Sequence, residues 1–528
     1  MFDDSVRDEC GIAVAAYLGH EAGGLETADP VDAARLIPGM LLDIQNRGQL
    51  AAGISTFSPE RRPLIRTHKE LGAVSEVFKL ADKVANKALM QRLAGTIAIG
   101  HTRYSTCGAD DVSYAQPLER VHGKPFKWFS FCFNGNVANH QQLAGKLVSE
   151  MGYHLTRPDS DTELFMHYLA FQQRGQRKAN WRKALGALCR VIDGAWSLAL
   201  INAAGDLVVA RDPVGIKPLC YGFRDGYLLA ASESIALQNM GVRDIVDVAP
   251  GTALIVEQGR LRVERFVPER RPAHCFFEWV YFANVASTIE SQSVYAARAR
   301  LGVALAELES ETVTPDHIVV PVPDTSKAAG DAFAYTLGLP SIEGLVRNRY
   351  VGRTFIETDD RAAKVRRKFV ALRGILQGRK IFLVDDSIVR STTLAYLIDY
   401  MREEGGAAEV HVRIACPPIM APCFYGIDMS TIGELFAPRF TDKPTLQGEL
   451  PAETRRAMAD AIGADSLNYL PVDKVASAIG LPQRSLCMAC VSRKYPTPMG
   501  RQLFRQAQAN VEAGITGGRT TMIANHCG

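Results

Sequence analysis

Residues 381–393, IFLVDDSIVRSTT, carry the strongest indication of how this chain folds. An apolar run ends in two acidic residues, Asp385 and Asp386, and a loop rich in hydroxyl side chains then leads into a helix-like stretch. Those hydroxyls belong to Ser387, Ser391, Thr392 and Thr393. Backbone N–H groups at a helix start, together with hydroxyls, can surround a phosphate dianion. The pattern favours a buried strand followed by a sugar-phosphate site, although an acidic strand end before an ordinary helix cap is the alternative.

Strand-like and helix-like segments alternate on both sides of this stretch. Apolar runs typical of buried strands occupy residues 317–322, 380–384 and 409–414. Helical spacing of apolar residues occurs at 295–308, 328–337 and 392–404. Such alternation is typical of a parallel sheet flanked by helices. We therefore expect an α/β domain with a parallel sheet over residues 266–500, followed by a C-terminal tail over 501–528.

The first half of the chain has a different pattern, mostly short strands with turn signals. The strand-like segments are GIAVAAYLG (11–19), GTIAIGHTRYST (95–106), GAWSLALINAAGDLVVARD (194–212) and GTALIVEQGRLRVERF (251–266). Two stretches, 31–45 and 160–173, have the apolar spacing of helices. We expect helices that cover a largely antiparallel β framework over residues 10–265. The charged, proline-rich segment VPERRPA (267–273) is expected to be a linker.

Length and composition agree with two domains of a globular protein. A chain of 528 residues is too long for one ordinary core. A net charge of +3 gives no reason to expect nucleic acid as a partner, and the basic run RAAKVRRK (361–368) is short enough for a solvated face. No apolar stretch reaches the roughly 18 residues of a membrane span. The N-terminus, MFDDSVRDE, is acidic where a secretory signal is basic. A cytoplasmic protein without membrane contact is expected.

Eleven cysteines in such a chain favour catalysis or metal binding, because disulfides are rare in the cytoplasm. Cys10, taken alone, is best interpreted as a buried strand residue. Cys487 and Cys490 form a C-x-x-C pair, which fits half of a zinc site, a redox pair or half of an iron–sulfur site. Cys275 and Cys423 are far away in sequence, so local spacing proves no cluster, and a four-thiolate zinc site remains an alternative.

The 381–393 stretch resembles the phosphoribosyl pyrophosphate motif of type I phosphoribosyltransferases. More narrowly, VDDSIVRSTT is similar to the form found in glutamine phosphoribosylpyrophosphate amidotransferases, with Ser391 where that family usually has glycine. A serine there narrows the backbone angles available. Further similar segments are PVPDTS (321–326), RNRYVGRTFI (347–356) and FYGIDMST (424–431).

This resemblance implies a magnesium–substrate site at Ser326, Asp385 and Asp386. It also implies that residues 347–356 begin a flexible loop that closes over the pyrophosphate and excludes water. Magnesium would neutralise the leaving pyrophosphate. The residues implied for phosphoribosyl pyrophosphate are Arg349, Asp385, Asp386, Ser387, Ser391, Thr392 and Thr393.

Four segments together with Cys10 resemble the glutaminase domain of class II, N-terminal-nucleophile amidotransferases. They are QNRGQLAAGI (45–54), GHTRYST (100–106), FNGNVANHQQL (133–143) and SDTE (160–163). The resemblance implies an αββα sandwich with Cys10 as nucleophile. An α-amino group, with a pKa near 8, could serve as base on the same residue. That requires removal of residues 1–9, so we expect a propeptide cleaved between Glu9 and Cys10.

The resemblance also assigns the parts of the glutamine pocket. Arg103 would pair with the α-carboxylate of glutamine and Asp161 with its α-ammonium group. Asn134 and the N–H of Gly135 would form the oxyanion hole. The residues that would frame the pocket are Arg47, Gly48, Tyr104 and Thr106. The sequence departs from the family at Asn46, Leu50 and Phe133, where a histidine, an acid and a histidine are common.

A subset of these amidotransferases carries both a propeptide and a structural [4Fe–4S] cluster. The cluster cysteines of that subset match Cys275, Cys423, Cys487 and Cys490, with Cys416 as a near neighbour. The family converts glutamine and phosphoribosyl pyrophosphate into 5-phosphoribosylamine, glutamate and pyrophosphate, the first step of de novo purine synthesis. It implies a homo-oligomer, often a tetramer, inhibited by purine nucleotides. The alternatives are a paralogue that aminates another phosphosugar and a non-catalytic phosphoribosyl pyrophosphate sensor.

Overall fold

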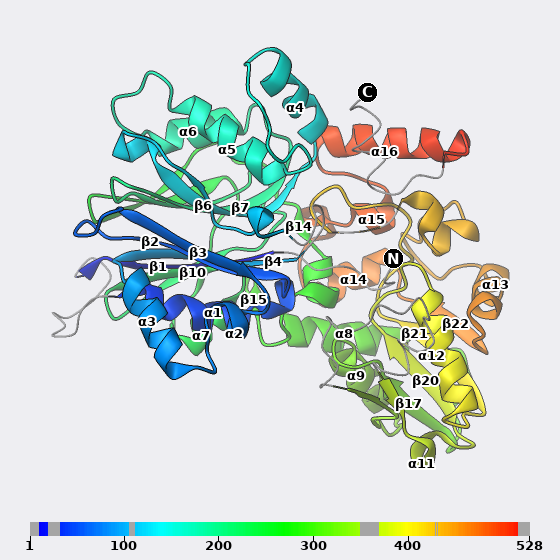
Figure 1. The fold of residues 1–528 in the computed structure, drawn as a ribbon. Helices are drawn as coiled ribbons and strands as arrows, with labels where there is room; N and C mark the ends of the chain where they lie inside the picture. Colours follow the sequence, from blue (N-terminus) through cyan, green and yellow to red (C-terminus); the bar gives the residue numbers. More distant parts are fainter. Residues whose placement is uncertain are drawn as a thin grey trace.

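The computed structural model describes residues 10–19, 32–104, 111–348, 369–427, 429 and 431–515. The first half of the chain contains two antiparallel sheets packed face to face (Figure 1). In sheet order, the seven-stranded sheet has β11 (Val246–Asp247), β9 (Cys220–Arg224), β10 (Tyr227–Ala231), β1 (Gly11–Tyr17), β4 (Ile97–Arg103), β2 (Ala51–Phe57) and β3 (Ile65–Leu71). The six-stranded sheet has β13 (Arg260–Arg265), β12 (Thr252–Glu257), β8 (Leu207–Arg211), β7 (Gly194–Asn202), β6 (Phe129–Val137) and β5 (Leu118–Arg120).

Helices cover the outer face of each sheet, which makes four layers (Figure 1). One outer layer has α1 (Ile37–Asp43), α2 (Val74–Val77), α3 (Lys83–Leu93) and α7 (Ser234–Asn239). The other has α4 (His140–Ser149), α5 (Asp161–Gln172) and α6 (Trp181–Leu188). Between the sheets lies an apolar layer that includes Val14, Ile99 and Leu254. The expected αββα sandwich is confirmed, because alternating apolar residues give each strand one face for the partner sheet and one for the helices.

The second half is built on a parallel sheet, as expected. Its strands are β17 (His317–Pro321), β20 (Lys380–Asp385), β21 (Glu409–Ile414) and β22 (Ser466–Tyr469), in that order across the sheet. The larger helices are α8 (Val294–Ala306), α9 (Lys327–Leu337), α12 (Thr392–Glu403), α13 (Ala452–Ile462), α14 (Val472–Ile479) and α16 (Pro498–Glu512). Shorter elements are α11 (Arg373–Leu376), α15 (Ala489–Ser492), and the strand pairs β14 (His274–Cys275) with β23 (Leu486–Cys487), β15 (Thr288–Ile289) with β16 (Gln292–Ser293) and β18 (Leu345–Arg347) with β19 (Phe369–Ala371).

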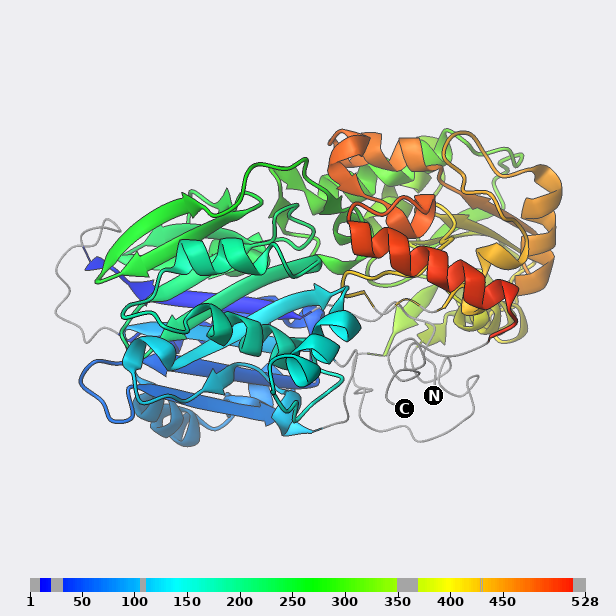
Figure 2. The same cartoon turned by 90° about the horizontal axis from the view of Figure 1, so that it is seen from above.

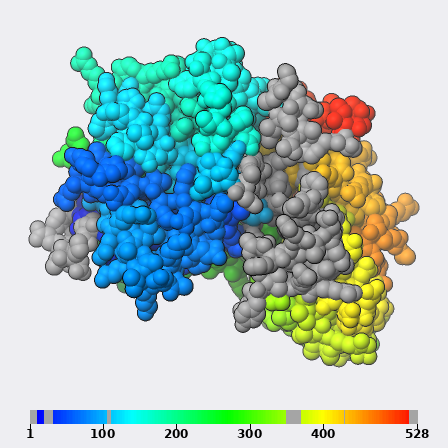
Figure 3. Space-filling view, in the orientation of Figure 1, coloured from blue at the N-terminus to red at the C-terminus, as the bar shows by residue number. Residues whose placement is uncertain are grey.

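The two halves lie side by side (Figures 2 and 3). Buried Arg47 of the first half forms an ion pair with Glu233 (2.6 Å) and with Glu278 of the second half (2.5 Å). Helix α16 begins at the boundary, where its Met499 N–H donates to Asp193 (2.9 Å), and then runs along the second half. This helix crosses residue 500, so the segment expected as a tail begins inside a helix. Among the described residues, no helix has the length and apolar character needed to span a membrane.

Candidate active sites

Cys10 lies directly before β1, beside the end of β4. The backbone of Tyr104 hydrogen-bonds to the Cys10 thiol, and the charges of Arg103, Asp161 and Lys217 act on it. Burial raises the pKa of this thiol, and the Tyr104 hydrogen bond and Arg103 offset part of that rise. A thiol with a raised pKa is a weak nucleophile until a base removes its proton. The structure therefore gathers Cys10 with three residues expected to bind glutamine.

Asp161 is the first residue of α5, where the helix dipole favours a carboxylate. Burial raises the pKa of the Asp161 carboxyl, while nearby His140 and the N–H of Val137, which donates to Oδ2 (3.2 Å), lower it. A buried carboxylate is stabilised by a cation or by hydrogen-bond donors. An ammonium group bound beside Cys10 would meet that requirement.

The Arg103–Tyr104 backbone packs directly against Gly48, and this contact is possible because Gly48 has no side chain. A Cβ at this position would lie 2.4 Å from the carbonyl carbon of Arg103 and 2.8 Å from the nitrogen of Tyr104. Arg47, its neighbour, has its guanidinium buried between Glu233 and Glu278. Arg47 thus contributes to the pocket indirectly. Its network of ion pairs with the two carboxylates holds in place the segment that carries Gly48. Sequence reasoning assigned Arg47 to the pocket without finding this network.

Asn134 and Gly135 lie on β6, and the structure shows why an asparagine and a glycine occupy these two positions. The Asn134 side chain is buried, and its Nδ2 has no hydrogen-bond partner in the described part of the chain. A buried amide donor left without an acceptor is costly, so such a group points to a ligand oxygen. A Cβ on Gly135 would lie 2.0 Å from the carbonyl oxygen of Ala195, so only glycine fits this strand pairing.

The three departures from the family pattern lie where they leave this site intact. Phe133 points to the opposite face of β6 from Asn134 and packs against Phe165, with ring centroids 5.0 Å apart. Asn46 donates to Glu233 (2.9 Å) and to the Phe282 carbonyl (2.9 Å), so it adds a link between the halves. Leu50 takes part through its backbone, whose N–H donates to the Arg103 carbonyl (3.1 Å).

The second site lies where β20 ends and α12 begins. Ser326 donates to Asp385 (3.0 Å), and Thr325 donates to Asp386 (2.5 Å), so the predicted loop 321–326 meets the predicted acidic pair. Ser387 also donates to Asp386 (2.8 Å). Two carboxylates with hydroxyl neighbours at the carboxyl ends of parallel strands fit magnesium, which uses few protein ligands and relies on substrate oxygens and water. The role of Thr325 was missed because its partner, Asp386, is 61 positions away in sequence.

Thr106 and Arg349 lie outside the described residues, as do residues 1–9. The other residues expected at the two sites are described. Of the first site, Arg103, Tyr104 and Asp161 act on Cys10, Gly48 lies against the Arg103–Tyr104 backbone, and Arg47 is engaged with two carboxylates. Of the second site, the residues from Asp385 to Thr393 span the end of β20, the loop and the start of α12, and Ser326 reaches Asp385 from the start of α9.

Ser391 is in the left-handed backbone region, with φ 72° and ψ −17°. This conformation costs an L-residue about 1–2 kcal/mol, whereas glycine costs about 0.4–1 kcal/mol more than other residues in chain entropy. Ser391→Gly is therefore expected to change the free energy of unfolding by between zero and about 1.6 kcal/mol in the stabilising direction. Urea unfolding of the second half measures this change. Ser310→Gly is the control, because Ser310 has no positive φ and should lose about 0.4–1 kcal/mol; equal losses in both variants would contradict the argument.

The four cysteines assigned to a cluster come from distant segments that meet beside the boundary between the halves. Cys275 and Cys487 are paired residues of the parallel strands β14 and β23. Cys490 follows in α15, and its backbone carbonyl accepts from the N–H groups of Met420 (2.7 Å) and Ala421 (3.0 Å), which brings the Cys423 segment alongside. Burial raises the pKa of Cys490 well above its usual range, and the charges of Cys423, Cys416 and Cys487 raise it further. The structure thus brings the predicted cysteines together and places Cys416 near them.

A zinc ion and an iron–sulfur cluster require different distances between the cysteine sulfurs that bind them. A tetrahedral zinc site holds its sulfurs about 3.8 Å apart, because each Zn–S bond is about 2.3 Å. Within the described ranges, no three cysteine sulfurs lie within 4.8 Å of one another. The Tyr425 N–H donates to the sulfur of Cys423 (3.3 Å), a type of bond common around iron–sulfur clusters. Four cysteines brought together in this way fit a polynuclear cluster.

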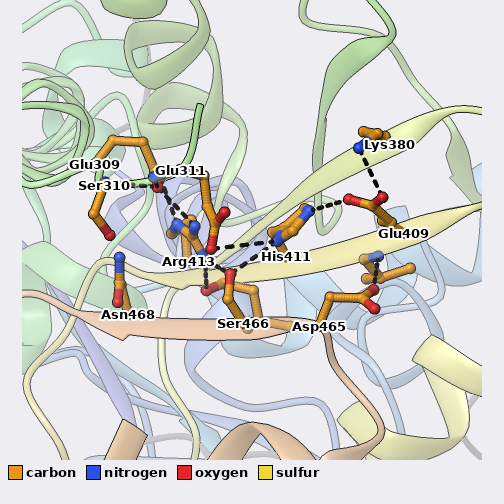
Figure 4. A network of polar contacts seen from close by, with 12 residues as sticks. Glu309, Ser310, Glu311, Lys380, Glu409, His411, Arg413, Asp465, Ser466 and Asn468 are labelled. Atoms are coloured by element: carbon orange, nitrogen blue, oxygen red, sulfur yellow. Dashed lines mark hydrogen bonds and ion pairs between the residues drawn. The ribbon is translucent and has the colours of Figure 1, made fainter. Parts of the chain in front are cut away.

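A different group of side chains lies where the strands of the parallel sheet begin (Figure 4). Potential ligand atoms of His317, Glu409 and His411 lie within 4.8 Å of one another. However, the Thr314 N–H donates to Nδ1 of His317 (3.0 Å), so the lone pair of Nδ1 is already used. The proton of the neutral ring is then on Nε2, and neither ring nitrogen of His317 can bind a metal ion. Glu409 already binds Lys380 (2.7 Å) and His411 (3.0 Å). We interpret this group as a structural network of polar contacts.

Comparisons with known proteins identify the family of this chain. A family model described as a glutamine amidotransferase domain matches residues 101–239. The amidophosphoribosyltransferase of Methanothermobacter thermautotrophicus is 38% identical over 502 residues, which are 94% of this chain and 96% of that protein. The chain belongs to the amidophosphoribosyltransferase family. Amidophosphoribosyltransferase 1 of Arabidopsis thaliana is 34% identical over 98% of this chain and 83% of its own.

A solved structure extends this family relationship to the fold. Glutamine phosphoribosylpyrophosphate amidotransferase from B. subtilis, complexed with ADP and GMP, has a TM-score of 0.78 and 32% identity, and the match covers 93% of this chain and 98% of that one. As an amidophosphoribosyltransferase, the chain is an enzyme with a glutaminase half and a phosphoribosyltransferase half. The expected fold class and the order of the two halves are thereby confirmed.

Proposed function

We propose that this amidophosphoribosyltransferase hydrolyses glutamine at Cys10 and transfers the ammonia to phosphoribosyl pyrophosphate, yielding 5-phosphoribosylamine and pyrophosphate. The observation that carries the proposal is that one chain contains two assembled sites. Cys10 lies with Arg103, Tyr104 and Asp161 in one half, and the acidic pair lies with Ser326 in the other. Growth of a purine auxotroph that expresses this chain tests the function. Failure of a soluble, metal-loaded protein to restore growth would favour a paralogue or a sensor instead.

The glutaminase half supplies each step of the first reaction. The α-amino group of Cys10 takes the thiol proton, and the sulfur attacks the side-chain amide carbon of glutamine. The oxyanion that forms accepts from Nδ2 of Asn134 and the N–H of Gly135. The protonated α-amino group then gives its proton to the leaving ammonia, and water hydrolyses the glutamyl thioester to glutamate. Arg103 and Asp161 hold the α-carboxylate and α-ammonium groups in place during both steps.

This mechanism requires that Cys10 become the first residue. We therefore propose that residues 1–9 form a propeptide cleaved between Glu9 and Cys10. The resemblance to the propeptide-bearing subset and the raised pKa of the thiol, which makes a local base necessary, support it. Intact mass of protein prepared without oxygen gives the test. Active enzyme that retains Met1 would contradict an α-amino base.

The transferase half supplies the second reaction. Asp385 and Asp386 would hold the ribose hydroxyls and magnesium, with Ser326 positioning Asp385. Magnesium, when bound, neutralises the charge of the leaving pyrophosphate. Ser387, Ser391, Thr392 and Thr393 surround the 5-phosphate together with the N–H groups at the start of α12. Arg349 would contact the pyrophosphate from the loop that closes over it.

We also propose that Cys275, Cys423, Cys487 and Cys490 hold a [4Fe–4S] cluster. Buried thiols with raised pKa values are poor anions until a metal neutralises them, and the pKa of Cys487 is raised to about 12 by burial. The cluster would be structural, since neither reaction transfers electrons. Native mass under anaerobic conditions tests it, because four irons and four sulfides add a defined mass. A protein that binds one zinc with equal stability would contradict this assignment.

The assembly and setting of the enzyme are further parts of the proposal. No disulfide joins the nine cysteines of the described segments to one another, which supports a cytoplasmic location. The B. subtilis relative was solved with ADP and GMP, which supports purine nucleotides as inhibitors of this chain. We propose a homo-oligomer, most simply a tetramer. The mass of the native enzyme measured by light scattering tests its oligomeric state.

Gly48→Ala is expected to raise the KM for glutamine at least about 10-fold, because the new Cβ would displace the Arg103–Tyr104 backbone by contact at 2.4 Å. Ammonia-dependent amination should be unchanged, since it does not use this pocket. Steady-state kinetics with glutamine and with ammonium chloride separate the two. Gly145→Ala is the matched control, because nothing lies within 4 Å of its Cβ position. An unchanged KM in Gly48→Ala would show that the pocket lies elsewhere.

A further inference from the structure

The turn that follows Cys423 lies against the strand that carries the oxyanion donors. Asn136, on β6 of the first half, donates from Nδ2 to the carbonyl oxygen of Phe424 (2.8 Å). The residues involved are 288 positions apart in sequence. Asn136 follows Gly135 directly, and along a strand its side chain points to the same face as that of Asn134. The hydrogen bond therefore holds the strand at the point where the oxyanion would bind.

Gly426 makes a second contact at the same place. A Cβ at this position would lie 3.4 Å from the carbonyl carbon of Gly135 and 2.9 Å from Nζ of Lys217. Its φ is +111°, which L side chains rarely adopt. Lys217 is buried, and its backbone carbonyl accepts from Nε of Arg211 (2.6 Å). The turn thus packs between Lys217 and β6 at a residue that has no side chain and a positive φ.

The other end of the turn is tied to the cysteine site. The Tyr425 N–H donates to the sulfur of Cys423 (3.3 Å), and the Tyr425 hydroxyl hydrogen-bonds to Thr497 (3.0 Å). Tyr495, whose ring lies 5.1 Å from that of Phe424, donates to the Pro422 carbonyl (2.5 Å). The turn is thus held on one side by Cys423 and its surroundings, and on the other by β6.

Oxyanion donors must lie within tenths of an ångström of the oxygen they bind, and removing one costs about 10²–10³ in rate. Strand β6 pairs with β7 along its whole length, including Asn136 with Ala195, so its own sheet fixes its register. The partner on the other edge, β5, reaches only as far as Phe131. Beyond Phe131, this edge of β6 has no paired strand among the described residues. The Asn134–Asn136 segment is instead supported by the contact of Asn136 with residues 424–426.

We propose that Asn136 is a positioning residue for glutamine hydrolysis, and that the turn 424–426 of the transferase half holds the oxyanion donors in place through it. This inference rests on the proposed roles of Asn134 and Gly135. It makes glutaminase activity depend on the order of the cysteine site, because Cys423 anchors the turn. The coupling runs through contact between the halves and needs no electron transfer.

Asn136→Ala in the full-length, metal-loaded enzyme tests the inference. We expect kcat for glutamine hydrolysis to fall about 10-fold, a fraction of the loss for a missing donor, with KM for glutamine unchanged. Ammonia-dependent amination and the visible absorption of the metal group should be those of the wild type. Gly426→Ala should show the same split, since its new Cβ would push the turn away from Gly135 and Lys217.

Asn139→Ala is the matched control. Within the described residues, its side chain donates to the Val191 carbonyl (2.8 Å) and accepts from the Asp193 N–H (2.9 Å), both in the first half. Its kcat should be unchanged even where its stability falls. If Asn136→Ala keeps the wild-type kcat, or if ammonia-dependent amination falls equally, the positioning role is wrong. If the wild type hydrolyses no glutamine, the proposed function fails, and the exchange measurement below decides the coupling.

Hydrogen exchange of peptides from β6 tests the link to the cysteine site without using activity. Removal of the metal group by oxidation and chelation should speed exchange at residues 134–137 in the wild type. The same treatment should cause no further increase in Asn136→Ala, where the link is already absent. Exchange in β6 that is independent of the metal group would overturn the coupling.

Discussion

Cys10→Ala is expected to lower glutamine-dependent amination at least about 10⁴-fold, since removal of a nucleophile costs up to about 10⁶ in comparable enzymes. The groups that act on the Cys10 thiol include Arg103 and Asp161, which we propose hold glutamine beside it. Amination with ammonium chloride should remain near the wild-type rate, since the transferase half is untouched. Parallel assays with both nitrogen sources measure the effect. Loss of the glutamine-dependent activity with retention of the ammonia-dependent activity is expected of an enzyme whose glutaminase site supplies ammonia to a second site.

Cys189→Ala provides the control for Cys10→Ala. Cys189 is a half-buried cysteine of the same half, and burial raises its pKa to about 12. An inert thiol of this kind should tolerate alanine with activity changed by less than about twofold. Glutamine-dependent activity that survives in Cys10→Ala would place the nucleophile elsewhere. Loss of both activities would indicate misfolding, which circular dichroism would reveal.

Asp385→Asn should have the second largest effect, a fall in kcat/KM for phosphoribosyl pyrophosphate of about 10²–10³. Loss of one carboxylate at a magnesium–substrate site removes several kcal/mol of charge stabilisation, and about 1.4 kcal/mol corresponds to each factor of ten. Asparagine keeps an oxygen that can accept from Ser326, so the loop 321–326 should stay in place. Both glutamine and ammonia should become poor nitrogen sources, whereas glutamine hydrolysis without transfer should persist.

Asp331→Asn is the matched change for Asp385→Asn. Asp331 is an exposed carboxylate in α9 that accepts from Ser341 (2.6 Å). It lies in the same half and should leave kcat/KM unchanged. A magnesium titration of the two variants adds a second measurement, since only Asp385→Asn should need more magnesium for half-maximal rate. Equal magnesium dependence would remove Asp385 from the metal site.

Local patterns predicted much of the fold. The strand expected at 380–384 is β20, Lys380–Asp385, and the helix expected at 392–404 is α12, Thr392–Glu403. Such elements are predictable because burial of one face imposes a period of two or of 3.6 on the apolar residues. Helix α16 was missed, although Thr497 followed by Pro498 is a helix-start signal and Phe504 and Ala507 have helical spacing. The polar residues of this helix resemble those of a tail.

The sequence could predict which residue types the candidate sites contain. It could predict only in part which residues contact one another there. Cys10, Asp161 and Asp385 were assigned from their resemblance to family motifs, and Cys10 needed four downstream segments, since taken alone it is best interpreted as a buried strand residue. Asn136, Lys217 and Thr325 were missed, since each acts through a residue that is distant in sequence. The pairing of Cys275 with Cys487 also depends on two strands that are far apart in sequence.

The sequence by itself determined the order of the two halves, the strand–loop–helix at 381–393 and the set of chemical groups available to each site. These follow from local periodicity and from motifs that fold within one turn of chain. Only the tertiary structure decided that Arg47 joins Glu233 to Glu278, that Phe133 turns into the core, and that Asn136 meets Phe424. The physical reason is that strand register and the docking of the halves minimise exposed apolar surface over the whole chain, which no local segment encodes.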